Sequence, residues 1–271
     1  CICELNSGKD MLYAPHNPLS PLVGKIGRNT PFRLSLNAGG PFLKCPTGAY
    51  NLLSPDNAAF DVLADIDIRV DVRPDLWYAT ASGQMLVNRV SAGTVSYAFA
   101  MDSSGSLYLW WTDTTTKFAK STDFTWFASG ERACLRATLD VNNDAAGWTA
   151  RFWWAKSMDA DVWNLIGDPV VGVGTTTLPN IGASIHLADA VITTLPDSSG
   201  SIGNLIGEFY GFQLWDGIND QIKVDLDLAR DGGPAAVGGT SRVDATGFTW
   251  TRSGTSSFSN LYVRSVGEIP A

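Results

Sequence analysis

The sequence has few of the side chains that carry out catalysis or bind metal ions. Its 271 residues include two histidines, His16 and His186, and four cysteines. Neither histidine lies at a spacing that would complete a zinc site, and neither is an evident general base for a nucleophile. Four cysteines are too few for a disulfide framework in a chain of this length, so we expect small buried thiols. Nucleophilic catalysis and structural zinc are therefore not predicted.

Long apolar runs and clusters of basic residues are also missing. No segment approaches the roughly 18 apolar residues that a membrane-spanning helix needs, so membrane insertion is not expected. The net charge is −8 and the sequence pI is about 4.7, whereas nucleic-acid binding needs clustered lysine and arginine. The sequence therefore predicts a globular domain that binds neither a bilayer core nor nucleic acid.

Glutamate is scarce, with four glutamates in the whole chain, and the other acids are aspartates. Glycosidases on β-sandwiches place paired acids, usually glutamates, on one strand, and the expected Glu-x-Asp-x-x-Glu pattern is absent. Asp65, Asp67 and Asp71 share a strand face and are the alternative acids. Because Arg69 lies among them, we interpret this face as a solvated structural surface. The protein is predicted not to be an enzyme.

Apolar and polar residues alternate along many short segments, as expected for strands with one buried face. The clearest alternation runs from Ala64 to Val72, and a hairpin is predicted from 133–141 and 148–154 around an Asn-, Asp- and Gly-rich turn. Further strands are expected at 85–90, 94–101, 106–111, 162–167, 184–187, 208–215, 221–228, 247–251 and 261–263. No segment has a persuasive helical period. The prediction is an all-β protein with two antiparallel sheets packed face to face, arranged as a jelly roll.

Proline is concentrated at one end of the chain. Residues 1–46 include Pro15, Pro18, Pro21, Pro31, Pro41 and Pro46, nearly half of the 13 prolines. Because proline disfavours helices and central strands, we expect residues 1–46 to form an extended N-terminal arm or linker. The jelly roll is expected to occupy residues 47–271.

Several motifs resemble a known family. Residues 134–143 (Cys-Leu-Arg-Ala-Thr-Leu-Asp-Val-Asn-Asn), the glycine turn after them, residues 149–153, the turn at 157–159 with Trp163, and residues 207–217 and 224–228 are similar to the concanavalin A/laminin-G-like lectin domains of minor tail proteins from actinobacteriophages. Residues 5–33 also resemble the segment that, in those proteins, closes an upstream domain and leads into the lectin-like one. The resemblance implies a concanavalin A-like sandwich whose arm continues an upstream domain.

The same resemblance implies a biological role. It predicts a non-enzymatic structural protein of the virion, extracellular on the phage tail or tail tip, with a lectin-like surface for host adhesion. Expected partners are other phage tail proteins, further copies in a symmetric homo-oligomer such as a trimer, and host cell-wall glycan. One alternative is a carbohydrate-binding module of a host-receptor binder or of a glycoside hydrolase. Another is a bacterial adhesin or a lipoprotein acylated at Cys1.

Ten tryptophans provide candidate glycan-binding residues, because aromatic faces stack on sugar rings. In each adjacent pair, Trp110-Trp111 and Trp153-Trp154, the two rings must point to opposite faces of a sheet. We therefore select Trp111 and Trp153, together with Trp163 after the next turn. Rings that are covered by loops or by a neighbouring subunit are the structural alternative.

A candidate calcium site follows from the resemblance, since laminin-G-like domains often hold Ca²⁺ at a sheet edge. Asp140, Asn142 and Asp144 offer the oxygen ligands that this ion prefers. The alternative is a hairpin whose turn is stabilised by the same Asp and Asn side chains. No other cofactor is predicted.

Overall fold

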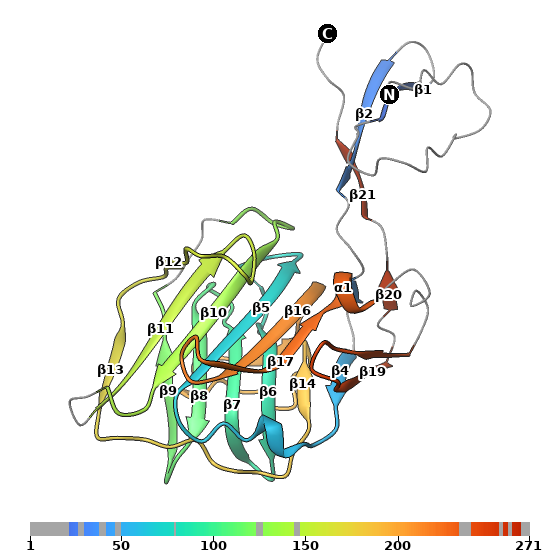
Figure 1. Ribbon diagram of the computed structural model, residues 1–271. Helices are drawn as coiled ribbons and strands as arrows, with labels where there is room; N and C mark the ends of the chain where they lie inside the picture. The colour runs from blue at the N-terminus through green and yellow to red at the C-terminus, as the bar shows by residue number, and fades with distance from the viewer. Residues whose placement is uncertain are drawn as a thin grey trace.

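Two β-sheets packed face to face make up the body of the molecule (Figure 1). The computed structural model describes residues 22–26, 30–37, 42–46, 50–78, 80–122, 127–143, 147–232, 240–254, 257–259 and 262–266. We call the sheet that lies nearer the viewer in Figure 1 the front sheet, and the sheet that lies behind it the back sheet. The predicted all-β sandwich is confirmed.

The front sheet contains the hairpin that the alternation predicted. Its strands follow the order β12 (Asn164–Leu165), β11 (Gly147–Ala155), β10 (Ala133–Asp140), β5 (Ile66–Pro74), β16 (Gly207–Asp216), β3 (Phe42–Cys45) and β20 (Ser257–Ser259), with β13 (Val170–Val173) also beside β11 and β17 (Gln221–Asp227) also beside β16. All of these pairings are antiparallel.

The back sheet is antiparallel apart from one pairing. Its strands follow the order β18 (Ser241–Val243), β19 (Thr249–Gly254), β4 (Tyr50–Ser54), β14 (Ile185–Leu187), β6 (Gly83–Ser91), β7 (Thr94–Met101), β8 (Leu107–Thr112) and β9 (Thr116–Lys120), and β15 (Ile202–Asn204) pairs with β6 in parallel. Helical structure among the described residues is limited to η1 (Ala58–Phe60) and α1 (Leu228–Gly232). No helix in those ranges is long and apolar enough to cross a membrane.

A third, smaller sheet joins segments from the two ends of the chain. It consists of β1 (Leu22–Ile26), β2 (Thr30–Asn37) and β21 (Tyr262–Val266). Residues 1–21 of the predicted arm lie outside the described residues, and its last strand, β3, pairs with β16 of the front sheet. The division into an arm and a lectin-like domain at residue 46 stays a prediction.

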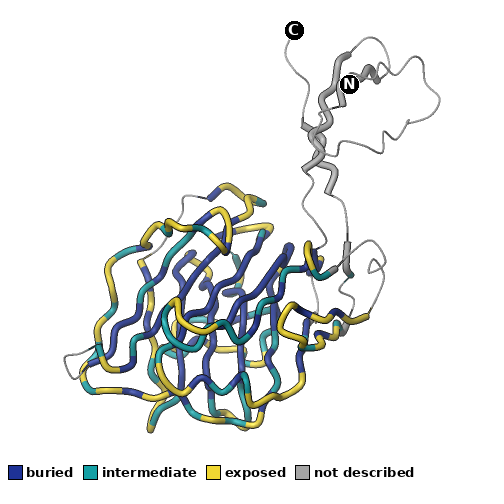
Figure 2. The backbone as a smooth tube through the Cα atoms, in the orientation of Figure 1, coloured by how far each residue is buried: buried dark blue, intermediate teal, exposed yellow. Residues whose placement is uncertain are grey.

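The core lies between the two large sheets, as Figure 2 shows by the buried central strands. On β5 the alternating residues Ile66, Ile68, Val70 and Val72 are fully buried against the back sheet. Burial of one such side chain contributes roughly 1.5–3 kcal/mol, which makes this apolar layer the main source of stability. Because successive side chains on a strand point to opposite faces, the same alternation aims Asp67, Arg69 and Asp71 at the outer face.

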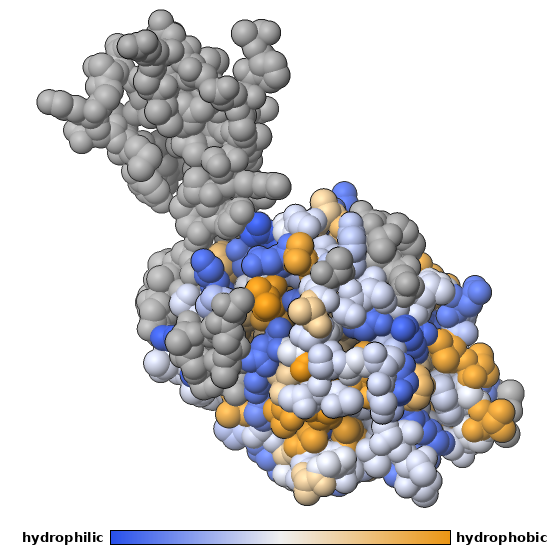
Figure 3. All heavy atoms as spheres, turned by 180° about the vertical axis from the view of Figure 1, so that it is seen from behind, coloured by the Kyte–Doolittle hydropathy of each residue, from blue (hydrophilic) through white to orange (hydrophobic). Residues whose placement is uncertain are grey.

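The outer face of the back sheet is covered by the chain's own residues. The loop at 188–202 packs Leu195 and Ile202 onto Met85, Tyr108 and Trp110, and all five side chains are buried. Figure 3 views the molecule from behind, with this sheet nearer the viewer, and shows apolar side chains in patches separated by polar surface. Both faces of the central back-sheet strands are therefore buried.

Candidate functional site

The outer face of the front sheet brings polar and aromatic side chains together through strand register. Trp153 of β11 lies opposite Arg136 of β10, and Arg136 lies opposite Arg69 of β5. Arg69 lies opposite Gln213 of β16. These four residues form one row across four strands, because directly opposed residues share a face of the sheet.

The neighbouring row has a carboxylate at its centre. Arg151 of β11 lies opposite Thr138 of β10, which lies opposite Asp67 of β5, and Asp67 lies opposite Trp215 of β16. Side chains in adjacent rows of one face are close enough for long residues to interact. Asp67 is therefore within reach of both arginines of the first row.

Asp67 offsets the repulsion between the two opposed arginines. Its Oδ1 and Oδ2 accept hydrogen bonds from Nε and Nη2 of Arg136 at 2.9 and 2.7 Å. Nε and Nη2 of Arg69 donate to the same two oxygens at 3.3 and 2.9 Å. The Asp67 side chain is fully buried, and both arginine side chains are 7% exposed. The three residues thus hold two positive charges and one negative charge out of water.

Three tryptophans surround this charge cluster and are themselves partly exposed. The ring of Trp163 lies 5.6 Å from the guanidinium carbon of Arg69 and 5.6 Å from that of Arg136. Trp215 lies 4.5 Å from Arg69, and Trp153 lies 5.8 Å from Arg136. Cation–π attraction between desolvated guanidinium groups and indole rings holds the rings in place. We call Trp153, Trp163 and Trp215 the tryptophan surface.

The loop between β11 and β12, residues 156–163, crosses the polar face and carries Trp163. The Met158 carbonyl accepts a hydrogen bond from Nη1 of Arg69 at 3.2 Å. The Met158 side chain is buried against Gly211, where a β-carbon would stand 2.5 Å from the methionine Cε. A glycine at position 211 therefore leaves the space that this loop needs.

The turn between β16 and β17 completes the cluster. Asn219 adopts a positive φ of 57° there, a conformation that asparagine tolerates better than most residues. Its Oδ1 accepts a hydrogen bond from Nη2 of Arg136 at 3.0 Å, and its backbone N–H donates to Asp67 Oδ2 at 3.4 Å. One turn and one loop therefore meet over the arginines.

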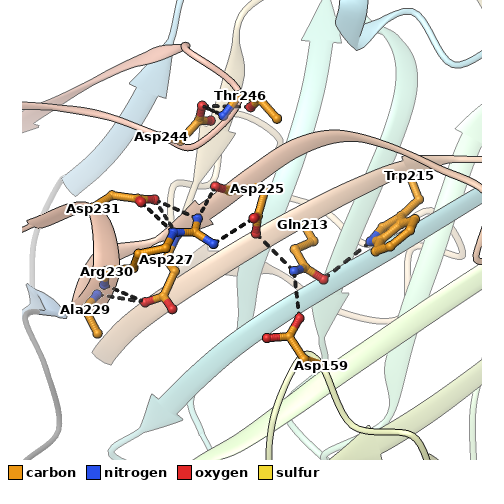
Figure 4. A network of polar contacts seen from close by, with 10 residues as sticks. All are labelled: Asp159, Gln213, Trp215, Asp225, Asp227, Ala229, Arg230, Asp231, Asp244 and Thr246. Carbon is orange, nitrogen blue, oxygen red and sulfur yellow. Dashed lines mark hydrogen bonds and ion pairs between the residues drawn. The ribbon is translucent and has the colours of Figure 1, made fainter.

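A polar network extends from the tryptophan surface toward β17 (Figure 4). Gln213 accepts a hydrogen bond from the Trp215 indole N–H at 3.4 Å, and its amide donates to Asp159 at 3.3 Å and to Asp225 at 3.0 Å. Asp225 in turn forms an ion pair with Arg230 at 2.7 Å. This network fixes the rotamer of Gln213 and the orientation of the Trp215 ring.

Farther along β5, a second arginine–aspartate pair lies nearer to solvent. Arg132 donates to Asp71 at 2.6 and 2.8 Å, and its guanidinium carbon lies 3.7 Å from the ring centre of Tyr210. Burial raises the pKa of Asp71 above its ordinary value, although hydrogen bonds from Arg132 act in the opposite direction. Asp67 and Asp71 are thus each bound by arginine.

The structure brings together two of the three predicted glycan-binding residues and separates the third. Trp153 and Trp163 both belong to the tryptophan surface. Trp111 is fully buried in the main core, where its indole N–H donates to Thr176 and its ring contacts Trp148 edge-on. The prediction of a surface position for Trp111 is therefore wrong, because this ring points inward between the sheets. Trp215 had not been selected.

The predicted calcium ligands lie at the turn after β10. Oδ1 of Asp140 accepts hydrogen bonds from the backbone N–H groups of Asn142 and Asn143 at 3.2 and 2.7 Å, so this carboxylate stabilises the turn. Asn142 lines a shallow depression of about 310 Å³ together with Asp65 and Asp216. Asp144 lies outside the described residues. The calcium site stays a prediction.

No protein-family model and no curated protein matches the chain. Among solved structures, a Bacteroides ovatus protein assigned provisionally to carbohydrate binding has a TM-score of 0.51 and 8% identity, covering 85% of this chain and 61% of that one. The chain thus spans less than two thirds of that structure's length. The LG4-5 domains of mouse laminin α1 give a TM-score of 0.47 and 13% identity, over 68% of this chain and 42% of that one.

A third structure is the CBM40 domain of a Ruminococcus gnavus sialidase bound to α2,3-sialyllactose, with a TM-score of 0.42 and 8% identity, over 66% of this chain and 93% of that one. Likeness at these identities concerns the fold. The predicted all-β sandwich of two antiparallel sheets is the fold that this chain shares with the Bacteroides ovatus protein.

Proposed function

We propose that this protein is a non-catalytic glycan-binding domain whose ligand stacks on the tryptophan surface. The observation that carries the proposal is the arrangement of Trp153, Trp163 and Trp215, which are partly exposed and surround a buried arginine–aspartate cluster. Aromatic faces offer apolar contact to the C–H groups of sugar rings. The fold shared with a protein provisionally assigned to carbohydrate binding is consistent with this function.

Rigidity of the rings strengthens the proposal. Each ring is positioned by a nearly buried guanidinium group, and the Trp215 indole N–H is bound to Gln213. A surface that is ordered before binding loses less conformational entropy when the ligand arrives. The charge cluster thus serves a binding surface by fixing its geometry.

The proposal is non-catalytic because the two β5 acids on this face, Asp67 and Asp71, are engaged in ion pairs. Asp67 is shared by two arginines, and Asp71 is paired with Arg132. Retaining and inverting glycosidases need one carboxylic acid to deliver a proton and one carboxylate to attack or activate water. A carboxylate bound bidentately by guanidinium is poorly suited to either role.

A glycan array, followed by isothermal titration of each hit, tests the proposal. We expect Trp163→Ala to weaken binding at least about tenfold, since truncation of an aromatic hot-spot residue costs about 2 kcal/mol or more and about 1.4 kcal/mol corresponds to tenfold. Phe118→Ala is the matched control, because Phe118 is a 38% exposed aromatic residue on β9 of the back sheet. Equal binding by the two variants, or no glycan hit at all, would refute the proposed function.

We also propose that the domain is displayed on a phage tail, extracellularly, beside other tail proteins and in a symmetric homo-oligomer. The support is the sequence resemblance at 134–143 and 207–217. Electron microscopy of intact particles would test this placement. Density for the sandwich at the tail is the expected result, and its absence from virions would exclude the role.

A further inference from the structure

Charge is unevenly distributed over the outer face of the front sheet. On the side of β16 and β17, carboxylates are the more numerous groups. Asp225 of β17 and Asp231 of α1 share the single cation Arg230. Toward β10 and β11, Arg69 of β5 and Arg136 of β10 share the single carboxylate of Asp67. One edge of the tryptophan surface therefore has an excess of positive charge.

Hydrogen-bond donors without acceptors lie on this positive side. Within the described part of the chain, Nη1 of Arg136 donates to no acceptor, and it is not among the fully buried atoms that lack a partner. The indole Nε1 of Trp153 is buried and has no acceptor in the same residues. A buried donor without an acceptor is costly, because it gives up its hydrogen bonds to water and gains none in return.

Arg151 adds a third cation to this side. It lies on β11 two residues from Trp153, is half-buried, and points to the same face. The ion pairs and hydrogen bonds of the described residues do not include its guanidinium group. Asp140, the nearest acid along the facing strand, uses its Oδ1 to accept the N–H groups of the following turn. Arg151 is thus available to a ligand.

We infer that the ligand of the tryptophan surface is a glycan with an anionic group, a carboxylate or a phosphate, which binds Arg151 and the free edge of Arg136. This inference rests on the proposed function and names the class of ligand. A planar guanidinium group matches carboxylate and phosphate oxygens in pairs, which gives orientation as well as attraction. The sugar ring next to the anionic group stacks on Trp153 or Trp163.

Isothermal titration with matched ligands tests the inference. The probes are a uronic-acid oligosaccharide, its carboxyl-reduced neutral counterpart, and a phosphate-bearing glycan of similar length with its dephosphorylated form. We expect the protein to bind at least one anionic member about tenfold or more tightly than its neutral partner, since hydrogen bonds to charged groups are the stronger class. The preference should shrink with added salt, because exposed charges are screened.

Three variants locate the anion. Arg151→Gln should abolish most of the preference for the anionic ligand, whereas Arg151→Lys should retain part of it. Lys44→Gln is the matched control, since Lys44 is an exposed cation on β3 of the same sheet, away from β11. Thermal unfolding of each variant checks that the fold is intact, and we expect little change because Arg151 has no partner among the described residues to lose.

The two proposals fail in different ways. If neutral and anionic glycans bind equally and Arg151→Gln binds both normally, the anionic preference is wrong and the glycan-binding function stands. If an anionic preference exists but responds to Lys44→Gln and not to Arg151→Gln, the assigned position is wrong. If no glycan binds, the proposed function and this inference both fail.

Discussion

The two outer faces of the sandwich are built in contrasting ways. The back sheet has its outer face covered by residues 188–202, which bury Tyr108 and Trp110 in an apolar cluster. The front sheet has no comparable apolar cover among the described residues, and the 156–163 loop crosses it through polar and aromatic contacts with Arg69 and Arg136. Both faces carry large aromatic rings: Trp153, Trp163 and Trp215 of the front face are partly exposed, whereas Tyr108 and Trp110 of the back face are buried and Phe118 at its edge strand β9 is 38% exposed.

This contrast indicates why binding is assigned to the front sheet. An aromatic ring in an apolar cluster stabilises the fold through burial, whereas a ring that contacts a guanidinium group with one face leaves its other face for a ligand. Nearly buried charges are a costly way to hold a loop, since their desolvation offsets much of their attraction. The presence of these charges under the tryptophan surface is explained if they hold the exposed rings in the geometry that binds a ligand.

The largest expected effect comes from the carboxylate at the centre of the front face. Asp67→Ala leaves two nearly buried guanidinium groups without their shared partner, and we expect a loss of about 3–5 kcal/mol in the free energy of unfolding. Chemical denaturation measures it. Asp71→Ala is the comparison, because its partner Arg132 is 39% exposed at the side chain, and a clearly smaller loss is expected. Equal losses would contradict the central role of Asp67.

A smaller loss is expected on the back face. Leu195→Ala removes a side chain that is 4% exposed within the apolar cluster, and large-to-small changes at such sites cost about 2–5 kcal/mol. Because this site lies at the periphery, we expect the low end of that range. Fluorescence quenching should show greater access to Trp110, while glycan affinity stays unchanged. A loss of glycan affinity would mean that the two faces are not independent.

A substitution at Gly211 should lower both the stability of the protein and its affinity for glycan, because it acts on the front face. A β-carbon at this position would stand 2.5 Å from Met158 Cε and 2.9 Å from the Leu226 carbonyl oxygen, so Gly211→Ala must move the Met158 side chain, which packs the 156–163 loop onto the sheet, and press on the β17 backbone. We expect a cost of about 1–3 kcal/mol and weaker glycan binding in titrations. Gly200→Ala in the back loop is the control, since its nearest neighbour would be 3.5 Å away. Normal binding by Gly211→Ala would argue against a role for the loop.

The smallest expected effect is a difference in pH dependence between the faces. At the turn between β7 and β8, burial alone would raise the pKa of Asp102, but hydrogen bonds from Ser104, Lys120 and Ser106 outweigh it and lower the pKa. A carboxylate whose pKa is lowered stabilises the folded protein at pH values above its ordinary pKa near 3.9, and this stabilisation is lost as the pH falls. Asp102→Asn should therefore make the acid limb of the stability curve shallower.

Asp71 on the front face should behave in the opposite way. Burial raises the pKa of this carboxyl in the folded protein. As the pH falls toward the ordinary pKa near 3.9, the folded state takes up the proton before the unfolded state does, and this uptake stabilises the folded state. Asp71→Asn removes this contribution, and its stability should fall more steeply with acidification than that of the unchanged protein. Denaturation curves between about pH 7 and 3 measure both variants. Parallel curves for the two would show that neither shift is real.

The strand alternation predicted much of the fold because it is a local property. The segment 133–141 and its return strand form β10 and β11 with the predicted faces, so that Trp154 packs on the core and Trp153 lies outside. The alternation did not predict the position of Trp111 correctly. Both faces of β8 are buried, one by the front sheet and one by residues 188–202, and alternation alone does not tell an inner layer from a covered outer one.

The charge cluster was not predicted because its members come from distant parts of the sequence. Asp67 and Arg136 meet only through the pairing of β5 with β10, and Trp215 joins them through the pairing of β5 with β16. Strand order and register depend on long-range packing rather than on local pattern. The alternation did predict that Arg69 shares a face with Asp67 and Asp71, but the prediction that this face is solvated is wrong, because all three residues are buried.

The most direct test of the account is to observe which tryptophans sense a bound glycan. The protein labelled with ¹⁵N at its indole nitrogens would be titrated with a glycan that binds, and the resonances would be assigned with single substitutions. We predict shifts at Trp153, Trp163 and Trp215 and none at Trp110 under the back loop. Shifts at Trp110, or at other indoles with the tryptophan surface unchanged, would contradict the assignment of binding to the front sheet.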